Sequence, residues 1–416
     1  MKQTYSKMKD SGVDTIGFIP TSWGTMKLKF LCEIMTGDQD TQDSVPDGIY
    51  PLYVRSSIVE KANKCTFEGE AILMAGDGVG AGKIFHHAFG KMAIHQRVYC
   101  LHNFHQINSN FLYYFVSNLF SLEIEKGSAK STVASVRLPM LKDFIIAFPI
   151  LEIQTDIANY LDAKCSEIDS IISEVKDCIE EYKNWKSSII SEAVTKGLDP
   201  NAKMKDSGVE WIGEIPEGWR IIKIKNVAYL DPSCCRPSDN CLVSFVPMEC
   251  IRANQRIKKV SLLSADNASY SSFNNGDIAL AKVSPCFENK NICTMSDLKN
   301  QYAFGSSELF NLRPFNVITN FLLYWLLTDR FIKNGVVYMT GVAGLKRIPS
   351  SYVKNAYITF PPIFTQTAIA NYLDAKCAQI DEIISEKELL ISDLESYKRS
   401  LICEIVTEKV RVSEDG

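Results

Sequence analysis

Ile157–Glu174 reads IANYLDAKCSEIDSIISE, and Ile369–Glu386 repeats it as IANYLDAKCAQIDEIISE. The second copy lies 212 residues after the first. The same offset holds as far as the EAVT of Glu192–Thr195 and the EIVT of Glu404–Thr407. The chain therefore carries one extended segment twice, and we expect the rest of it to be organised around the two copies.

Each copy is predicted to form a long helix with one apolar stripe. Neither copy contains Pro or Gly, and apolar residues recur in alternating steps of four and three, which is a heptad seam. Lys387 is the one break in the second copy. A rise of 1.5 Å per residue makes each helix roughly 65 Å long. The predicted packing positions are Leu161, Cys165, Ile168, Ile172, Val175, Ile179 and Tyr182, and then Leu373, Cys377, Ile380, Ile384, Ile391 and Leu394.

A helix of this length needs a partner to cover its apolar stripe. The simplest partner is the other copy in the same chain. The alternative is an amphipathic linker surrounded by solvent. The presence of the same seam in both copies favours the paired helices.

The composition is that of a soluble globular protein. The 416 residues can hold two or three domains, with 46% hydrophobic and 23% charged residues. No run of about 18 apolar residues predicts a membrane span, and MKQTYSKMKDSG lacks a signal-peptide core. These features favour a cytoplasmic protein without membrane contact. The 13 cysteines include no C-x-x-C, which predicts reduced, mostly buried thiols.

The charge is unevenly distributed along the chain. The net charge is −4, yet residues 220–363 hold 17 Lys and Arg against 9 Asp and Glu. The helical segments are acidic, with 10 acidic and 5 basic residues in 151–197. A basic globule joined to acidic helices is typical of a nucleic-acid binder with a spacer, although ordinary charge scatter also explains the pattern.

A second repeat precedes each globular region. MKDSGVDTIGFIPTSW at Met8–Trp23 recurs as MKDSGVEWIGEIPEGW at Met204–Trp219. The order is thus short motif, variable domain and helix, twice over. The variable domains share little identity while their frames are nearly duplicated. This contrast suggests two copies of one design that recognise different targets.

The variable domains are predicted to mix strands and helices. GIYPLYV, EAILMAG and MAIHQRVYCL in the first, and CLVSFVPME, GDIALAKV and SSELFNLRP in the second, are typical of strands. Asn108–Gly127 and Ile318–Gly335 are predicted to be matching helices.

A glycine-rich run and a group of histidines resemble a phosphate-binding loop and a metal site, but neither matches the residue pattern that such a site needs. The run Gly76–Lys83 does not match the phosphate-binding motif G-x-x-x-x-G-K-[ST]. Asp77 stands where the motif needs its first glycine, and Ile84 stands where it needs the Ser or Thr that holds magnesium. It is better interpreted as a glycine-rich turn between strands, which can still approach a DNA backbone closely. The five histidines have no accompanying ligand pattern, so we expect no metal.

Basic loops at matching places suggest DNA contact, with solvated loops as the alternative. Lys, Ser and Asn side chains are the usual donors to phosphates and base edges. The candidate DNA-binding residues are Gly78, Lys83, Lys130 and Ser131 in the first domain, and Lys282, Ser284, Asn289, Lys290, Lys346 and Arg347 in the second.

Catalytic motifs are missing from the sequence. It contains no [N/D]-P-P-[Y/F] motif, no complete Walker motif and no distinct P-D…E-x-K nuclease cluster. The missing motifs argue against an enzyme in its own right, and we expect no cofactor in this chain. The duplicated frame, the divergent domains and the basic second domain favour a non-catalytic DNA-reading protein. The competing hypotheses are a nuclease or methyltransferase acting alone, and a coiled-coil scaffold with no role in DNA binding.

The chain resembles the DNA-specificity subunits of Type I restriction–modification systems. The resemblance rests on SGVEWIGEIPEGW and its N-terminal counterpart, GDIALAKVSPCFENKN, FGSSELFNLRP, and Q-T-x-IANYLDAK in both copies, at Gln154 and Gln366. The first domain departs from this pattern, with GEAILMAGDGVGAGK in place of GDIALAKVSP. Base-contacting positions should therefore not be transferred from one domain to the other.

The resemblance implies an α+β fold with a pseudo-two-fold internal repeat: two target-recognition domains (1–150 and 198–363) separated by two antiparallel coiled-coil helices (151–197 and 364–410). Each domain would read one half of a bipartite double-stranded DNA site, and the helices would fix the gap between the halves. The implied partners are two modification (methyltransferase) subunits and the restriction (endonuclease and translocase) subunits. S-adenosylmethionine, ATP and Mg would be bound by those partners.

Overall fold

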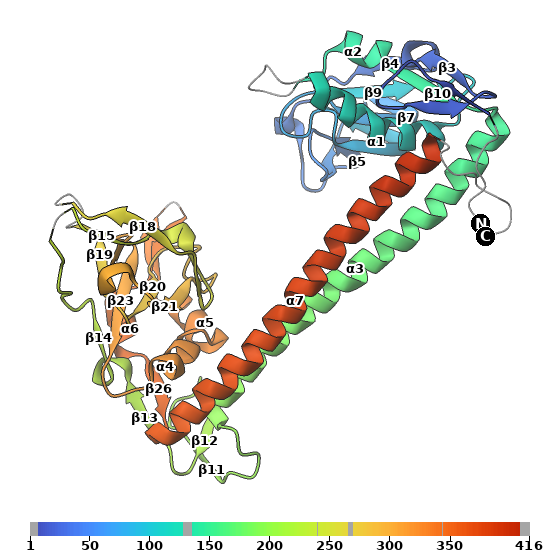
Figure 1. The fold of residues 1–416 in the computed structure, drawn as a ribbon. Helices are drawn as coiled ribbons and strands as arrows, with labels where there is room; N and C mark the ends of the chain where they lie inside the picture. Colours follow the sequence, from blue (N-terminus) through green and yellow to red (C-terminus); the bar gives the residue numbers. More distant parts are fainter. Residues whose placement is uncertain (1–6, 128–134, 239, 265–268, 343, 408–416) are drawn as a thin grey trace. The chain divides into compact units, whose positions relative to one another are not determined.

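A computed structural model describes residues 7–127, 135–238, 240–264, 269–342 and 344–407 of the chain. The chain divides into two compact units, Met1–Val175 with Glu388–Gly416, and Lys176–Lys387. Each unit contains one globular domain and a stretch of each long helix (Figure 1).

The first domain is built on a six-stranded sheet in the order β4-β9-β7-β8-β5-β6. All neighbours pair antiparallel except β5 and β8, which are parallel. The strands are β4 (Glu33–Thr36), β5 (Tyr50–Tyr53), β6 (Glu60–Ala62), β7 (Phe67–Ala75), β8 (Phe85–Ile94) and β9 (Val98–His102). Beside the sheet lie the pairs β1 (Met8–Asp10) with β2 (Phe18–Pro20) and β3 (Gly24–Lys27) with β10 (Ile145–Phe148), and the helices α1 (Ser109–Gly127) and α2 (Leu138–Asp143).

Strand β7 is buried on both faces, which explains its continuous apolar run. Successive side chains of a strand point to opposite faces. Ile72 and Met74 accordingly belong to the core that contains Phe111 and Phe115 of α1. Ala71 and Leu73 belong to a second, smaller core on the other face.

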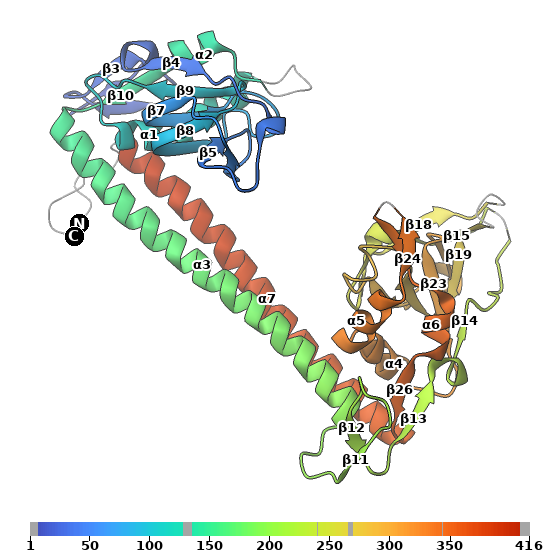
Figure 2. The ribbon, with the colours of Figure 1, turned by 180° about the vertical axis from the view of Figure 1, so that it is seen from behind.

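The second domain has two four-stranded sheets, β14-β23-β20-β21 and β18-β15-β22-β19 (Figure 2). Their strands are β14 (Ala228–Leu230), β15 (Leu242–Val246), β18 (Lys259–Leu262), β19 (Ser271–Asn274), β20 (Ile278–Ala281), β21 (Ile292–Thr294), β22 (Tyr302–Gly305) and β23 (Leu309–Pro314). The remaining elements are β11 (Met204–Asp206) with β12 (Glu214–Pro216), β13 (Arg220–Lys223) with β26 (Tyr357–Phe360), β16 (Ile251–Arg252) with β17 (Gln255–Arg256), β24 (Thr340–Val342) with β25 (Leu345–Arg347), and the helices α4 (Thr319–Leu326), α5 (Asp329–Val337) and α6 (Ser350–Asn355).

The two domains share one frame. The order β14-β23-β20-β21 repeats β4-β9-β7-β8, and the pairs β11-β12 and β13-β26 repeat β1-β2 and β3-β10. The predicted α+β architecture with an internal repeat is confirmed. None of the described helices combines the length and apolar character needed to cross a membrane.

The prediction of one helix over Ile318–Gly335 is wrong, because the chain forms α4 and α5 there. Thr328 caps α5, and its hydroxyl accepts a hydrogen bond from the Phe331 backbone N–H. The same hydroxyl donates to the Trp325 carbonyl. A threonine followed by an aspartate is an N-cap signal, and it starts a new helix here.

Each domain is fastened to the helix that follows it by the same polar contacts. The helices are α3 (Leu151–Lys196) and α7 (Ile363–Val406). Tyr114 donates its hydroxyl to Asp162 in the first unit, and Tyr324 donates to Asp374 in the second. The tyrosine–aspartate contact is therefore part of the shared frame.

The long helices pack antiparallel within each unit. In the first unit, Leu161 and Cys165 near the start of α3 share a core with Ile402 and Ile405 near the end of α7. In the second unit, Ile190, Ala193 and Val194 near the end of α3 share a core with Ile369, Leu373 and Cys377 near the start of α7. The predicted seam residues Leu161, Ile168, Ile172, Ile179, Leu373 and Ile380 are buried, whereas Ile384 and Ile391 are only half-buried. Lys387, the break in the heptads, places its ammonium group 5.8 Å from the centre of the Tyr182 ring.

Ion pairs between the helices support this pairing. Lys186 of α3 lies 2.6 Å from Asp381 of α7 in the second unit, and Lys398 of α7 lies 2.6 Å from Asp169 of α3 in the first. We expect Lys186→Glu to lower the free energy of unfolding by about 1 kcal/mol, because it places a carboxylate beside Asp381. Adding Asp381→Lys should restore most of that loss in urea denaturation. Lys176→Glu, at an exposed position of the same helix, is the control. Equal losses in the single and double variants would contradict the contact.

Candidate nucleic-acid interface

Each domain contains its own sheet with the common strand order, and the backbone has the same hydrogen-bond pattern at one end of both sheets. In the first domain, the Gly76 N–H donates to the Arg97 carbonyl, and the Val136 N–H donates to the Gly76 carbonyl. In the second, the Lys282 N–H donates to the Glu308 carbonyl, and the Ile348 N–H donates to the Lys282 carbonyl. The isolated bridges Asp77–Ser135 and Val283–Arg347 complete the correspondence. We name this end of each domain its loop pole.

The first loop pole is formed mainly by the glycine-rich turn, which connects β7 to β8 as predicted. Gly80 is required there, because a Cβ atom would lie 2.7 Å from the Arg55 carbonyl oxygen. Gly78 has a φ of 78°, and Val79 at the tip is 99% exposed. Lys83 is exposed at the end of the turn. Lys130 and Ser131 lie outside the described residues.

The second loop pole brings four of the six predicted residues together. Lys282 and Ser284 follow β20, and Lys346 and Arg347 lie on β25, where the Ser284 N–H donates to the Lys346 carbonyl. The Lys282 ammonium donates to the Ser307 carbonyl and lies 4.5 Å from the centre of the Phe310 ring. Ser284 donates its hydroxyl to Glu288. Lys346 is exposed.

Lys290 and Asn289 lie further along the turn that follows β20. The Lys290 ammonium is 2.6 Å from Asp329, the first residue of α5, so its charge is already paired. The Asn289 side chain is exposed. The structure thus places these two residues apart from the contact between the turn and β25.

Sequence reasoning missed the carboxylates of the loop poles and two arginines that they hold. Asp77 accepts from Arg55 at 2.9 Å and from Arg97 at 2.5 Å. Glu308 accepts from Arg347 through Nε at 2.8 Å and Nη2 at 2.7 Å. No local signal connects residues that lie 20 to 39 positions apart in the chain.

The ion pairs keep both carboxylates charged. Burial acts to raise the pKa of Asp77, but hydrogen bonds from Arg97 and Arg55 outweigh it and hold the pKa below its ordinary value. The hydrogen bond from Arg347 lowers the pKa of Glu308, and the pKa of Arg347 is raised in return. The loop poles therefore hold fixed charges at neutral pH.

Among the described residues, no three His, Cys, Asp or Glu side chains gather as a metal-ligand set. All 13 cysteines lie in the described part of the chain, and none of them forms a disulfide; six are buried, and only Cys235 is exposed. Burial raises the pKa of Cys32 and of Cys100 to about 12, which keeps both thiols protonated.

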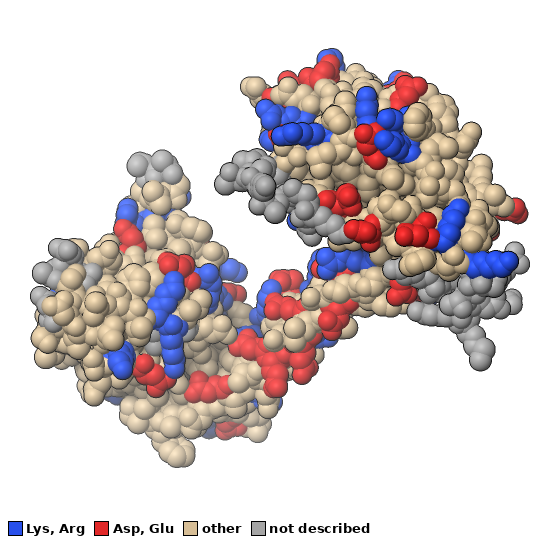
Figure 3. Space-filling model, turned by 45° about the horizontal axis from the view of Figure 1, so that its top comes forward, with Lys and Arg blue, Asp and Glu red and all other residues tan. Residues whose placement is uncertain are grey.

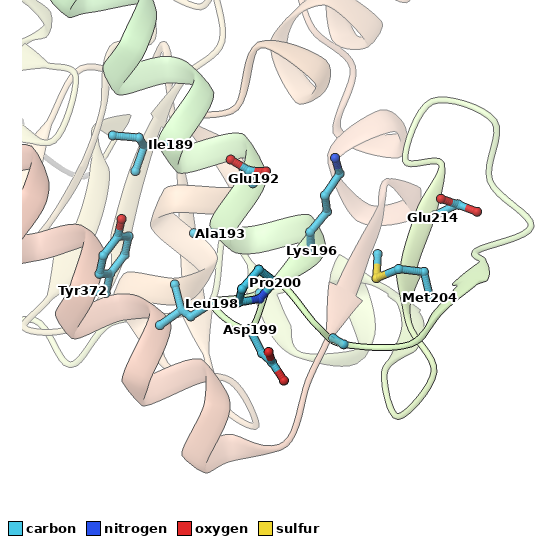
Figure 4. A pocket seen from close by; sticks show the side chains of 12 residues that line it. Ile189, Glu192, Ala193, Lys196, Leu198, Asp199, Pro200, Met204, Glu214 and Tyr372 are labelled. Atoms are coloured by element: carbon cyan, nitrogen blue, oxygen red, sulfur yellow. The ribbon is translucent and has the colours of Figure 1, made fainter.

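A cavity of about 570 Å³ lies in the second unit beside the last turns of α3 (Figure 4). The cavity is lined by those turns and by the chain segment that follows them. Met204 of β11, Glu214 of β12 and Tyr372 of α7 complete the lining. The titratable side chains around it do not include a nucleophile paired with a base. It therefore offers no catalytic constellation.

A model of the family described as Type I restriction modification DNA specificity domain matches residues 20–181. The EcoDI specificity subunit of Escherichia coli is 21% identical over 93% of this chain and 88% of its own length.

The chain is similar to Type I restriction–modification specificity subunits over most of its length, and its residues 20–181 match their DNA specificity domain.

Two further relatives match more strongly over a shorter part. The EcoAI specificity subunit of Escherichia coli is 34% identical over 47% of this chain, and the EcoEI specificity subunit is 33% identical over 44%. The chain spans about a third of the length of these two relatives, 34% and 32%. One solved structure, which concerns complex assembly and conformational transition of the type I R-M system, covers 93% of this chain with a TM-score of 0.67 and 15% identity. That likeness shows a shared overall fold. The family resemblance predicted from the sequence is confirmed.

Proposed function

We propose that this chain is the DNA-specificity subunit of a Type I restriction–modification complex and that it catalyses no reaction itself. Each domain reads one half of a bipartite double-stranded DNA site with its loop pole. The observation that carries the proposal is the identical backbone frame of the two loop poles, on which the side chains differ. Two copies of one frame with different side chains suit two half-sites of different sequence.

The charge distribution supports the same division of roles. Acidic side chains are gathered along the long helices, while basic side chains are scattered over the domains (Figure 3). A phosphate backbone attracts the basic second domain, with 17 Lys and Arg against 9 Asp and Glu in residues 220–363, and is repelled by acidic helices. The helices therefore serve as spacers and as surfaces for partner proteins rather than as a DNA-binding face.

The proposed division of the chain is 1–150 and 198–363 for target recognition and 151–197 and 364–410 for the helices. The proposed partners are two modification subunits and the restriction subunits, which bring S-adenosylmethionine, ATP and Mg. The specificity chain needs no cofactor of its own, and it acts with its partners in the cytoplasm.

Methylome sequencing of a host that expresses the chain with its cognate modification subunit tests this proposal. We expect a split adenine-methylated motif with a fixed unread gap, present only when both genes are expressed. Methylation at one uninterrupted motif, or an identical motif without this chain, would contradict the proposal.

Lys346 provides a local test of DNA contact. It is exposed on β25, and we expect Lys346→Glu to weaken cognate DNA binding roughly tenfold and to reduce the slope of log affinity against log salt by about 1. Binding is measured by titration of the purified complex at several salt concentrations. Reversing Lys290 or Arg347 is less informative, because the new carboxylate would face Asp329 or Glu308.

Lys225→Glu is the matched control. Lys225 is exposed beside β14, whose first residue, Ala228, pairs with Pro314 at the far end of β23 from Glu308. Its reversal should leave the affinity within about twofold of wild type. Equal losses from Lys346→Glu and Lys225→Glu would show that general charge, and not the loop pole, governs binding.

A further inference from the structure

Arg55 and Arg97 at the first loop pole are held in place while most of their donors stay unused. Each contacts Asp77 through Nη1. Asp77 is 16% exposed, whereas the arginine side chains are 41% and 62% exposed. A guanidinium group has five N–H donors in a rigid plane. Among the described residues, the hydrogen bonds of both arginines go through Nη1 alone, so the edge formed by Nε and Nη2 is available to a ligand.

Arg313 shows what a purely structural arginine looks like in this chain. Its Nε and Nη2 donate to Asp277, and its Nη1 donates to the Ser233 carbonyl. Asp277 is 1% exposed and Arg313 is 29% exposed. All three nitrogen atoms of Arg313 are engaged, so it holds the sheet together and has little left to offer DNA.

The second loop pole contains the same kind of pair with its components moved. Glu308 occupies the place of Arg97 in the frame. The Glu308 carbonyl accepts from the N–H of the residue after β20, as the Arg97 carbonyl accepts from the N–H of the residue after β7. Arg347 occupies the place of Ser135, because Arg347 forms an isolated β-bridge with Val283 as Ser135 does with Asp77. Glu308 contacts Nε and Nη2 of Arg347, which leaves Nη1 and one N–H of Nη2. One frame therefore carries an arginine–carboxylate contact in two different arrangements.

A paired arginine suits a base edge better than a phosphate. The pair of Arg347 and Glu308 has no net charge. Contact with a phosphate would therefore add little electrostatic free energy of binding and would release few counterions. A fixed guanidinium plane can still donate two parallel hydrogen bonds to O6 and N7 of guanine in the major groove. The carboxylate holds the side chain in one orientation before DNA binds, which reduces the entropy lost on binding.

We propose that the Asp77-held arginines Arg55 and Arg97 read guanine in one half-site, and that Glu308-held Arg347 reads guanine in the other. Asp77 and Glu308 are positioning residues that act through the arginines. The inference rests on the proposed function and adds to it the base that is read and the residues that read it.

The test uses the complex of the full chain with its modification subunit, and selects bound duplexes from a randomised pool. Arg97→Lys and Arg347→Lys keep the charge and remove the planar fork. We expect each variant to lose the guanine preference at one or two positions of a single half-site, while the other half-site stays unchanged. Affinity for the cognate duplex should fall roughly 5- to 150-fold, as expected for one bidentate base contact. Affinity for unrelated DNA should stay within about twofold.

Glu308→Gln tests the positioning role. It should lower the ratio of cognate to unrelated DNA affinity, because Arg347 becomes mobile and its charge is no longer balanced. Glu308→Asp should restore part of the guanine preference. Arg399→Lys, at an exposed position on α7, is the control and should change neither quantity.

Replacing single guanines of the cognate duplex by 7-deazaguanine tests the wild-type protein without any substitution. This base lacks the N7 acceptor, so one guanine in each half-site should show a clear loss of affinity. The inference fails if the lysine variants keep the wild-type motif, or if they lose affinity equally for all sequences. Failure of the wild-type complex to enrich any sequence would instead overturn the proposed function.

Discussion

Gln366→Leu is expected to lower the free energy of unfolding of the second unit by about 2–4 kcal/mol. Gln366 is fully buried, its Oε1 accepts from the Ile318 N–H at 3.0 Å, and its Nε2 donates to the Pro361 carbonyl at 2.8 Å. Leucine fills a similar volume but leaves both backbone groups without a partner, at about 1–3 kcal/mol for each buried group. Urea denaturation followed by far-ultraviolet circular dichroism measures the loss.

Gln154→Leu should have a similar effect in the first unit. Its Oε1 accepts from the Asn108 N–H at 2.7 Å, and its Nε2 donates to the Pro149 carbonyl at 2.9 Å. Gln379→Leu, at an exposed position on α7, is the control for the change in side chain. Each glutamine connects the start of a long helix to backbone groups of its domain, and a loss no greater than that of the control would show that these contacts contribute little to stability.

Trp325→Ala is expected to cost about 3–5 kcal/mol, because it opens a large cavity in the core of the second domain. Trp325 is fully buried and donates its indole N–H to the Thr359 hydroxyl at 2.9 Å. That hydroxyl donates in turn to the Val194 carbonyl at the end of α3. The side chain therefore ties α4, β26 and α3 together.

Trp185→Ala is the matched control, since Trp185 lies on α3 and is 50% exposed. It should cost less than about 1 kcal/mol in the same urea titration. Similar losses for the two tryptophans would contradict the assignment of Trp325 to the core.

The repeated frame could be predicted because its signals are local. The seam of α3 and α7 follows from apolar spacing, and Leu161, Ile168 and Leu373 are buried as that spacing requires. Spacing identifies the buried face of a helix but not what covers it. Ile384 and Ile391 fit the heptads and are nevertheless only half-buried, and Leu389 between them is 64% exposed.

The loop poles could be located from the sequence, but their chemistry could not. Basic Gly and Ser loops at matching places indicated where Lys346 and Arg347 would lie. The contacts of Asp77 with Arg55 and Arg97 depend on how β7, β9 and the chain after β5 come together in the sheet. Sequence separation hides such pairs, and only the tertiary fold shows which cations are already matched by acids.

Selection of randomised duplexes by the complex of this chain with its modification subunit tests the central claim most directly. The account predicts enrichment of one bipartite sequence with a fixed unread gap. It also predicts that a substitution at the second loop pole, such as Arg347→Lys, alters only one half of that sequence. Enrichment of no sequence, or a change in both halves from a single-pole substitution, would contradict the assignment of one domain to each half-site.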